Sequence, residues 1–347
     1  MNGTCLNPLP IGELTLKNRV ITAPMAGLTN YAFRQILSRQ RPGLIFTEMI
    51  SAQALVYQNQ KTLELIQKPP QAIDEGGFVP LAVQLSGSDP AYMAQAAKLA
   101  AKLGADVIDL NMGCPAPKII KNGEGCRLMQ TPDLAARIME AVVCAMEQYQ
   151  AEENLTTKIP VTVKFRSGWD DESINCVPFA KMAENLGIFA VTVHGRTRQQ
   201  FYGGKADRDC IAQVAAAVDI PVIGNGDIIS PADAVAMLQQ TGCAGIMVGR
   251  GMLGNPWLIA DIIAVLSGGV PRGKPDKAEI LRAALAHLRL QAAYSPNGDE
   301  MAVCAMRTHL AHYFKGMKHA AMMRQAVNQM KTIKEIELAF ADWSAKE

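Results

Sequence analysis

The chain has 347 residues, of which 49% are hydrophobic and 19% charged, and its 34 Lys and Arg against 32 Asp and Glu give a formal net charge of +2. This composition is ordinary for a folded protein with a large buried core, and it argues against a disordered chain. The near balance of charge neither demands nor excludes a polyanionic partner, so any nucleic-acid surface must be local.

Neither a membrane nor a metal is expected as a partner. The N-terminus has no basic or apolar leader, and no apolar run reaches the length of a membrane span. The eight cysteines are scattered, with no C-x-x-C pair and no Cys/His cluster at metal-ligand spacing. We therefore expect a cytoplasmic protein with reduced thiols and no metal site.

A short run rich in Val, Ile and Leu, followed by a polar or glycine-rich segment and then an amphipathic stretch, recurs between residues 20 and 256. Residues 91–103 and 231–240 are two of the helical stretches, and each follows a serine or aspartate and a proline that favour a helix start. The eight apolar runs, which we predict to be strands, are 20–27, 44–51, 80–87, 107–115, 161–168, 190–196, 221–227 and 245–251.

Alternation of short strands with helices predicts a parallel sheet, and eight units within about 250 residues is the number at which such a sheet closes into a (β/α)8 TIM barrel. An open, doubly wound sheet is the alternative. A barrel places its functional side chains at the C-terminal ends of the strands. Polar residues do occur at those ends, for example Glu48, Gln84 and His194.

Two domains are expected. Residues 1–266 would form the barrel, with a short hairpin at 11–18 that closes its bottom. Residues 267–275 are rich in glycine and proline and predict a linker. Everything after it is helical in period, so 276–347 would form a small all-helical domain, whose basic residues include Arg307, Lys315, Lys318 and Arg324.

Cys114 follows a buried strand directly, in the segment 111–115 (NMGCP). A core cysteine is expected within an apolar run, whereas this one lies on the loop beyond it and so faces the mouth of the barrel. It could attack as a nucleophile with His194 as base, bind a metal, or deliver a proton to a substrate that has accepted a hydride. The sequence offers no partners for a metal site. Proton delivery has the fewest requirements of the three, since it needs only a protonated thiol and a suitable substrate.

Lys164 and Arg166 end the fifth strand and, two residues apart, point to the same side. A lysine in a buried strand is costly unless it is paired or solvated, which favours a functional role. The seventh and eighth predicted strands end in 224–227 (GNGD) and 249–251 (GRG). The loops after these two strands are the ones from which barrels commonly build phosphate sites. Residues 249–254 also match the dinucleotide fingerprint, but no further strand follows, so we interpret them as a barrel phosphate loop.

Together these segments resemble the tRNA-dihydrouridine synthases over about residues 14–330. None of them would suffice alone. The matching segments are 23–27 (APMAG), 84–87 (QLSG), 111–115 (NMGCP), 163–166 (VKFR), 193–196 (VHGR), 224–228 (GNGDI) and 248–250 (VGR).

The resemblance implies an FMN-containing barrel that uses NADPH to reduce a uridine of tRNA, with the helical domain contacting the tRNA. It also implies roles for single residues. Cys114 would be the proton donor, and Asn111 and Arg166 would contact the uracil. The flavin would be lined by Pro24, Met25 and Ala26, bound at its ring edge by Gln84 and Lys164, approached by His194, and held at its phosphate by Asn225, Gly226, Asp227, Gly249 and Arg250.

One segment departs from the family pattern. After the glycine of 121–127 (KNGEGCR) the family more often has small residues, so Arg127 puts the shape of the substrate entrance in doubt.

Two rival functions remain open. A flavin enzyme acting on a free pyrimidine, of the dihydroorotate or dihydropyrimidine dehydrogenase type, would leave the helical domain unexplained, and a non-catalytic RNA-binding protein would have no use for Cys114 and Lys164.

Overall fold

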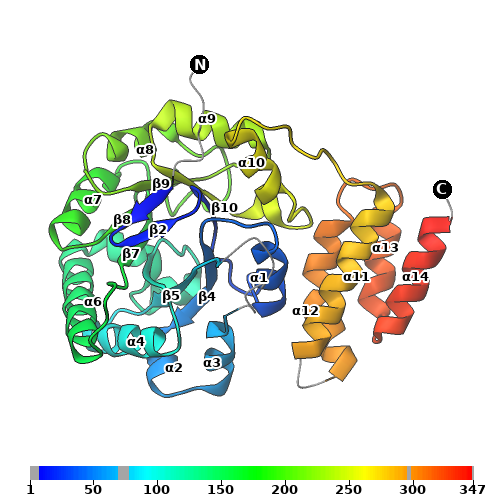
Figure 1. Cartoon of the computed structure of the whole chain (residues 1–347), viewed down its shortest axis with the longest axis horizontal. Coiled ribbons are helices and arrows are strands. Elements are labelled where there is room, and N and C mark those ends of the chain that lie inside the picture. Colours follow the sequence, from blue (N-terminus) through cyan, green and yellow to red (C-terminus); the bar gives the residue numbers. More distant parts are fainter. Residues whose placement is uncertain (1–7, 69–77, 295–297, 346–347) are drawn as a thin grey trace.

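A computed structural model describes residues 8–68, 78–294 and 298–345, and its main feature is a barrel of eight parallel strands surrounded by helices (Figure 1). The first and last strands of the sheet meet through a parallel bridge between Ile21 and Leu44, where Thr22 N donates to Leu44 O at 3.0 Å. The TIM barrel is thus confirmed over the open sheet. Its strands, in spatial order, are β3 (Val20–Thr22), β10 (Gly245–Val248), β9 (Val222–Asn225), β8 (Ala190–His194), β7 (Val161–Arg166), β6 (Val107–Met112), β5 (Leu81–Ser86) and β4 (Ile45–Ser51).

All eight predicted strands are present, and most are shorter at their C-terminal ends than predicted. The polar and glycine residues there leave the sheet and form the loops of the barrel mouth. The predicted helix starts are also confirmed: Asp89 caps α4 by accepting from Ala91 N and Tyr92 N, and Ser230 caps α9. The helices around the barrel are α1 (Tyr31–Ser38), α2 (Ala52–Val56), α3 (Gln60–Ile66), α4 (Pro90–Lys102), α5 (Pro117–Lys121), α6 (Pro132–Glu152), α7 (Cys176–Asn185), α8 (Arg208–Ala215), α9 (Pro231–Thr241) and α10 (Leu258–Leu266), with short 3₁₀ turns at Gly125–Gln130 and Arg250–Met252.

The predicted hairpin is present as β1 (Leu9–Ile11) and β2 (Leu14–Leu16), paired antiparallel. Its apolar side chains form one cluster with inward-facing residues of the barrel strands, among them Val107, Ala190 and Met247. The hairpin therefore closes the N-terminal end of the barrel and leaves the other end for the site.

The barrel interior changes from apolar to polar along its axis. On β6, Val107 belongs to the apolar cluster beneath, whereas Asp109 and Asn111, which point to the same side, are polar and buried. The same change occurs on the neighbouring strands. Toward the C-terminal ends of the strands, the apolar layer is followed by a polar layer of side chains. Its members are Gln84, Asp109, Asn111, Thr162, Lys164, Thr192, His194 and Asn225.

Four further helices pack beside the barrel (Figure 1): α11 (Lys277–Tyr294), α12 (Gly298–Tyr313), α13 (Ala320–Gln329) and α14 (Ile333–Ala345). They share an apolar cluster of their own, which includes Trp343 and also Trp257 from the end of the barrel segment. His309 of α12 bonds to Leu28 O at 3.0 Å, and Tyr31 of α1 contacts the ring of Tyr294. Residues 1–7 and 346–347 of the two expected domains lie outside the described residues. In the part of the chain that is described, no helix combines the length and apolarity needed to cross a bilayer.

Gly254, in the barrel segment, packs against the backbone of α12. Its φ is +68°, and a Cβ there would lie 2.3 Å from the carbonyl carbon and oxygen of His312. Gly273 in the linker also has a positive φ, +87°, but nothing lies within 4 Å of its Cβ position.

We expect Gly254→Ala to lower the free energy of unfolding by about 2 kcal/mol more than Gly273→Ala, because both substitutions strain the backbone but only the first meets α12. Urea unfolding followed by circular dichroism measures the difference. Equal losses in the two variants would show that α12 does not pack against Gly254.

Candidate active site

Cys114 lies just beyond β6 at the polar end of the barrel, on a loop folded by the side chain of Asn111. The side-chain oxygen of Asn111, Oδ1, accepts hydrogen bonds from the backbone N–H groups of Gly113 (3.3 Å) and Cys114 (3.1 Å). Asn111 Nδ2 donates to Gln84 Oε1 at 2.7 Å. The Cys114 loop is therefore fastened to a side chain inside the barrel, and Asn111 has a positioning role that the sequence did not reveal.

Hydrogen bonds link Gln84 in turn to Asp109, a buried acid that was not predicted as a site residue. Gln84 Nε2 donates to Asp109 Oδ2 at 2.8 Å, and Thr162 Oγ1 donates to Asp109 Oδ1 at 2.6 Å. Burial raises the pKa of the Asp109 carboxyl to about 6, against the opposing effect of these bonds and of the Lys164 charge. The available signal was an ionisable residue in the middle of a buried strand, since such a residue needs partners.

The Cys114 thiol is protonated at neutral pH. Burial raises its pKa, and the hydrogen bond with Ala116 and the Arg166 charge offset that effect only in part. A protonated thiol can donate a proton but is a poor nucleophile. No hydrogen bond joins it to His194 within the described chain, so the arrangement favours proton delivery over nucleophilic attack.

Lys164 points into the barrel mouth, as predicted. Its Nζ donates to Asn225 Oδ1 at 3.0 Å, and Asn225 Nδ2 donates to Met247 O at 2.8 Å. Burial and the neighbouring Arg166 lower the pKa of the ammonium to about 8. Burial and the surrounding cations, Lys164 first among them, lower the pKa of His194 well below its usual value, so this imidazole is neutral.

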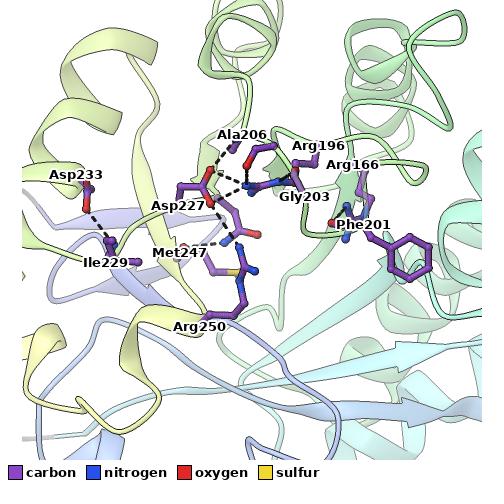
Figure 2. A network of polar contacts seen from close by, with 12 residues as sticks. Arg166, Arg196, Phe201, Gly203, Ala206, Asp227, Ile229, Asp233, Met247 and Arg250 are labelled. Carbon is purple, nitrogen blue, oxygen red and sulfur yellow. Dashed lines mark hydrogen bonds and ion pairs between the residues drawn. The ribbon is translucent and has the colours of Figure 1, made fainter. Parts of the chain in front are cut away.

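Arg166 joins two loops of the mouth, and Figure 2 shows its bond to Phe201. Its Nε donates to Gly113 O at 2.9 Å, beside Cys114, and its Nη1 donates to Thr197 O at 3.0 Å and Phe201 O at 2.8 Å. The guanidinium thus links the loop after β6 to the loop after β8. Within the described chain its Nη2 has no hydrogen bond, and it is the atom left for a substrate.

Arg196 and Asp227 form the centre of a second network (Figure 2). The almost fully buried Arg196 contacts both Asp227 oxygens, at 2.9 and 2.8 Å, and also donates to Gly203 O at 2.9 Å and Gly204 O at 2.7 Å. Although partial burial raises the pKa of Asp227, the hydrogen bond from Ala206 N and the Arg196 contact bring it below its usual value. The Asp227 carboxylate therefore shapes the loop, and only its backbone remains for an anion.

The two predicted phosphate loops follow the paired strands β9 and β10 and lie side by side. Their glycines, Gly226 and Gly249, differ in how closely other atoms pack around them. Gly226 has φ +134° and packs so closely that a Cβ would lie 2.5 Å from Ala206 Cβ. At Gly249 a Cβ would meet only Ala23 Cβ, at 3.6 Å. The Arg250 side chain is 51% exposed and only 3.5 Å from an Asp227 oxygen. Gly249 and Arg250 thus form a candidate anion site, with open backbone at the glycine and a half-exposed guanidinium beside it.

The loop with Pro24, Met25 and Ala26 lies next to this anion site, because Ala23 N donates to Val248 O at 2.8 Å. Glu48, whose role the sequence left open, accepts a hydrogen bond from Gly27 N and holds the loop. Burial raises the pKa of its carboxyl, despite that bond. Glu48 therefore acts as a hydrogen-bond partner of this loop.

The family model described as dihydrouridine synthase (Dus) matches residues 21–346. The chain belongs to the dihydrouridine synthase family. It is 41% identical to a "Probable tRNA-dihydrouridine synthase" of Rickettsia conorii over 322 residues, which are 93% of this chain and 92% of that one. It is 37% identical to "tRNA-dihydrouridine synthase B" of Vibrio vulnificus over 320 residues, 92% of this chain and 94% of the relative.

The fold of this dihydrouridine synthase is shared more widely. The old yellow enzyme homologue from Zymomonas mobilis superposes with a TM-score of 0.53 at 16% sequence identity, over 73% of this chain and 90% of that one. At this identity the likeness concerns the barrel alone.

The segment that departs from the family pattern is well ordered in this synthase. Cys126 is buried under the Cys114 loop, where its N donates to Cys114 O at 3.1 Å and burial raises its thiol pKa to about 12. The exposed Arg127 donates to Gln130 Oε1 at 2.6 Å, and its guanidinium lies 5.9 Å from the ring centroid of Trp169. The departure leaves the loop intact and places an arginine on its surface. Among the described residues, no group of His, Cys, Asp and Glu is arranged to hold a metal ion.

Arg196→Ala should loosen the loop after β8, because it removes the buried guanidinium that donates to the Asp227 carboxylate and to two loop carbonyls. We expect trypsin to cleave the variant after Arg198 or Lys205 at least about tenfold faster than the unsubstituted protein. Arg208→Ala is the control, since within the described residues the Arg208 side chain donates to the exposed Gln240 side chain and to no loop carbonyl. Equal cleavage of all three proteins would contradict the role given to Arg196.

Proposed function

We propose that this dihydrouridine synthase reduces uridines of tRNA to 5,6-dihydrouridine, with FMN as its bound cofactor, NADPH as reductant and Cys114 as the acid. One observation carries the proposal: a protonated thiol is fixed by Asn111 at the polar end of the barrel, within the field of Arg166 and Lys164. The names of the Rickettsia and Vibrio relatives indicate the same reaction.

The residues present fit FMN. Lys164 Nζ uses one of its three donors on Asn225, so it can also donate to the polar edge of the flavin ring. The ring would lie against Met25 and its neighbours Pro24 and Ala26. Open backbone at Gly249 and the half-exposed guanidinium of Arg250 suit the phosphate. Bound FMN would supply hydride chemistry at one carbon of the uracil double bond, with NADPH as the source of the electrons.

Cys114 supplies the proton that the adjacent carbon then requires. Its raised pKa keeps the proton on the sulfur until the base becomes electron-rich. The Arg166 and Lys164 charges, which lower that pKa, stabilise the thiolate that remains. The free Nη2 of Arg166 and the second N–H of Asn111 Nδ2 are the donors left for the uracil oxygens, where negative charge grows during the reaction.

The C-terminal helices offer a surface for the rest of the tRNA. A groove on α12 and α13 is lined by the cationic side chains of Arg307, Lys315 and Arg324, and no carboxylate lines it. Such a groove suits a phosphate backbone. A target uridine in folded tRNA must be extruded to reach the barrel mouth, which costs a few kcal/mol that contacts of this kind offset.

Cys114→Ala should keep its bound flavin but slow the oxidation of the NADPH-reduced holoenzyme by unmodified tRNA about 10²- to 10⁴-fold, because the general acid is lost. Single-turnover absorbance near the flavin maximum measures the rate, and Cys144→Ala, at an exposed position of α6, is the control. An unchanged rate in Cys114→Ala would disprove the acid role. Faster turnover of free uracil or dihydroorotate than of tRNA would show that the substrate is a free pyrimidine.

A further inference from the structure

The loop between β8 and α8 presents an exposed aromatic side chain at the barrel mouth. Tyr202 is 54% exposed, and the guanidinium carbons of Arg250 and Arg166 lie 4.8 and 5.7 Å from the centroid of its ring. One of these arginines belongs to the anion site and the other holds the Cys114 loop. Tyr202 therefore stands between the two sides of the active site with much of its ring open to solvent.

Arg198, on the same loop, is held by two rings and lacks an ionic partner. Its guanidinium carbon lies 4.7 Å from the ring centroid of Trp169 and 5.6 Å from that of Phe201. Among the residues that the structure describes, no carboxylate pairs with Arg198, and its Nε is buried without a hydrogen-bond partner. A guanidinium held in this way keeps its two terminal nitrogens, Nη1 and Nη2, for a ligand, and such a pair of donors matches a phosphate.

The loop is held in one conformation. Phe201 has φ +51°, in the left-handed region that residues with a side chain seldom adopt, and its carbonyl accepts from Arg166. The backbone N–H groups of Arg198 and Gln199 donate at 2.9 Å to the carbonyls of Gly168 and Trp169. Backbone strain maintained by so many contacts is typical of binding sites.

We propose that Arg198 and Tyr202 bind the nucleotides of tRNA that flank the target uridine, Arg198 through a phosphate and Tyr202 by stacking on a base. Trp169 and Phe201 are positioning residues that hold the Arg198 guanidinium. The inference rests on the proposed function and specifies its substrate contacts.

RNA is the ligand that fits both features. Unpaired nucleotides are recognised by aromatic faces together with guanidinium groups, and extrusion of a uridine disturbs the stacking of its neighbours. The acidic segment 170–172 (DDE) follows Trp169 directly, and its negative charges repel phosphate.

The test is the Kd of an unmodified tRNA transcript for the holoenzyme, measured by filter binding over a range of salt concentrations. We expect Tyr202→Ala and Arg198→Ala to weaken binding about tenfold, and Tyr202→Phe, which keeps the ring, to bind normally. Arg198→Ala should also reduce the salt slope by about 1, whereas Tyr202→Ala should leave it unchanged. Arg137→Ala, at an exposed position of α6, is the control for loss of charge.

Binding does not require turnover, so this test can fail while the proposed function holds. Normal tRNA binding by both alanine variants would overturn the inference, even if the unsubstituted protein reduces tRNA. A loss of affinity for NADPH in place of tRNA would also overturn it, because the surface would then belong to the nicotinamide dinucleotide.

Discussion

The side-chain amide of Asn111 connects the barrel interior to the catalytic loop, and the account of the site depends on it. Its oxygen orders the backbone that carries Cys114, and its nitrogen is bound to Gln84, which is bound in turn to Asp109. Each of these side chains comes from the polar layer of the barrel. The position of the thiol is therefore set by packed strands and not by the loop alone, which is how a site on a loop obtains a fixed geometry.

Two buried arginines extend this control to the other side of the mouth. Arg166 and Arg196 donate to the carbonyls of four residues in the loop after β8, and Arg196 also neutralises Asp227. Burying a charge is costly, and these hydrogen bonds offset that cost while they fix the geometry of the loop. The same contacts hold Phe201 in its strained conformation and place Tyr202 and Arg198 at the rim. Catalytic and RNA-facing parts of the mouth thus share one framework.

The sequence predicted the barrel because its period is visible locally: short apolar runs, glycine or proline at their ends, and helix caps such as Asp89. It also placed Cys114 and Lys164 at the mouth of the barrel, and both lie at its polar end. It could not predict which side chains form hydrogen bonds across strands. Those bonds depend on the register of adjacent strands, which lie far apart in the sequence. Asp109 and the loop-holding roles of Asn111 and Asp227 were missed for this reason.

The central claim is that this chain places dihydrouridine in tRNA, and mapping that nucleoside in cells tests it most directly. Chemical mapping of dihydrouridine should be carried out on tRNA from cells that lack the gene and from the same cells with the gene restored. The account predicts that at least one dihydrouridine position is lost in the first and regained in the second. Identical dihydrouridine maps in the presence and absence of the protein would contradict it.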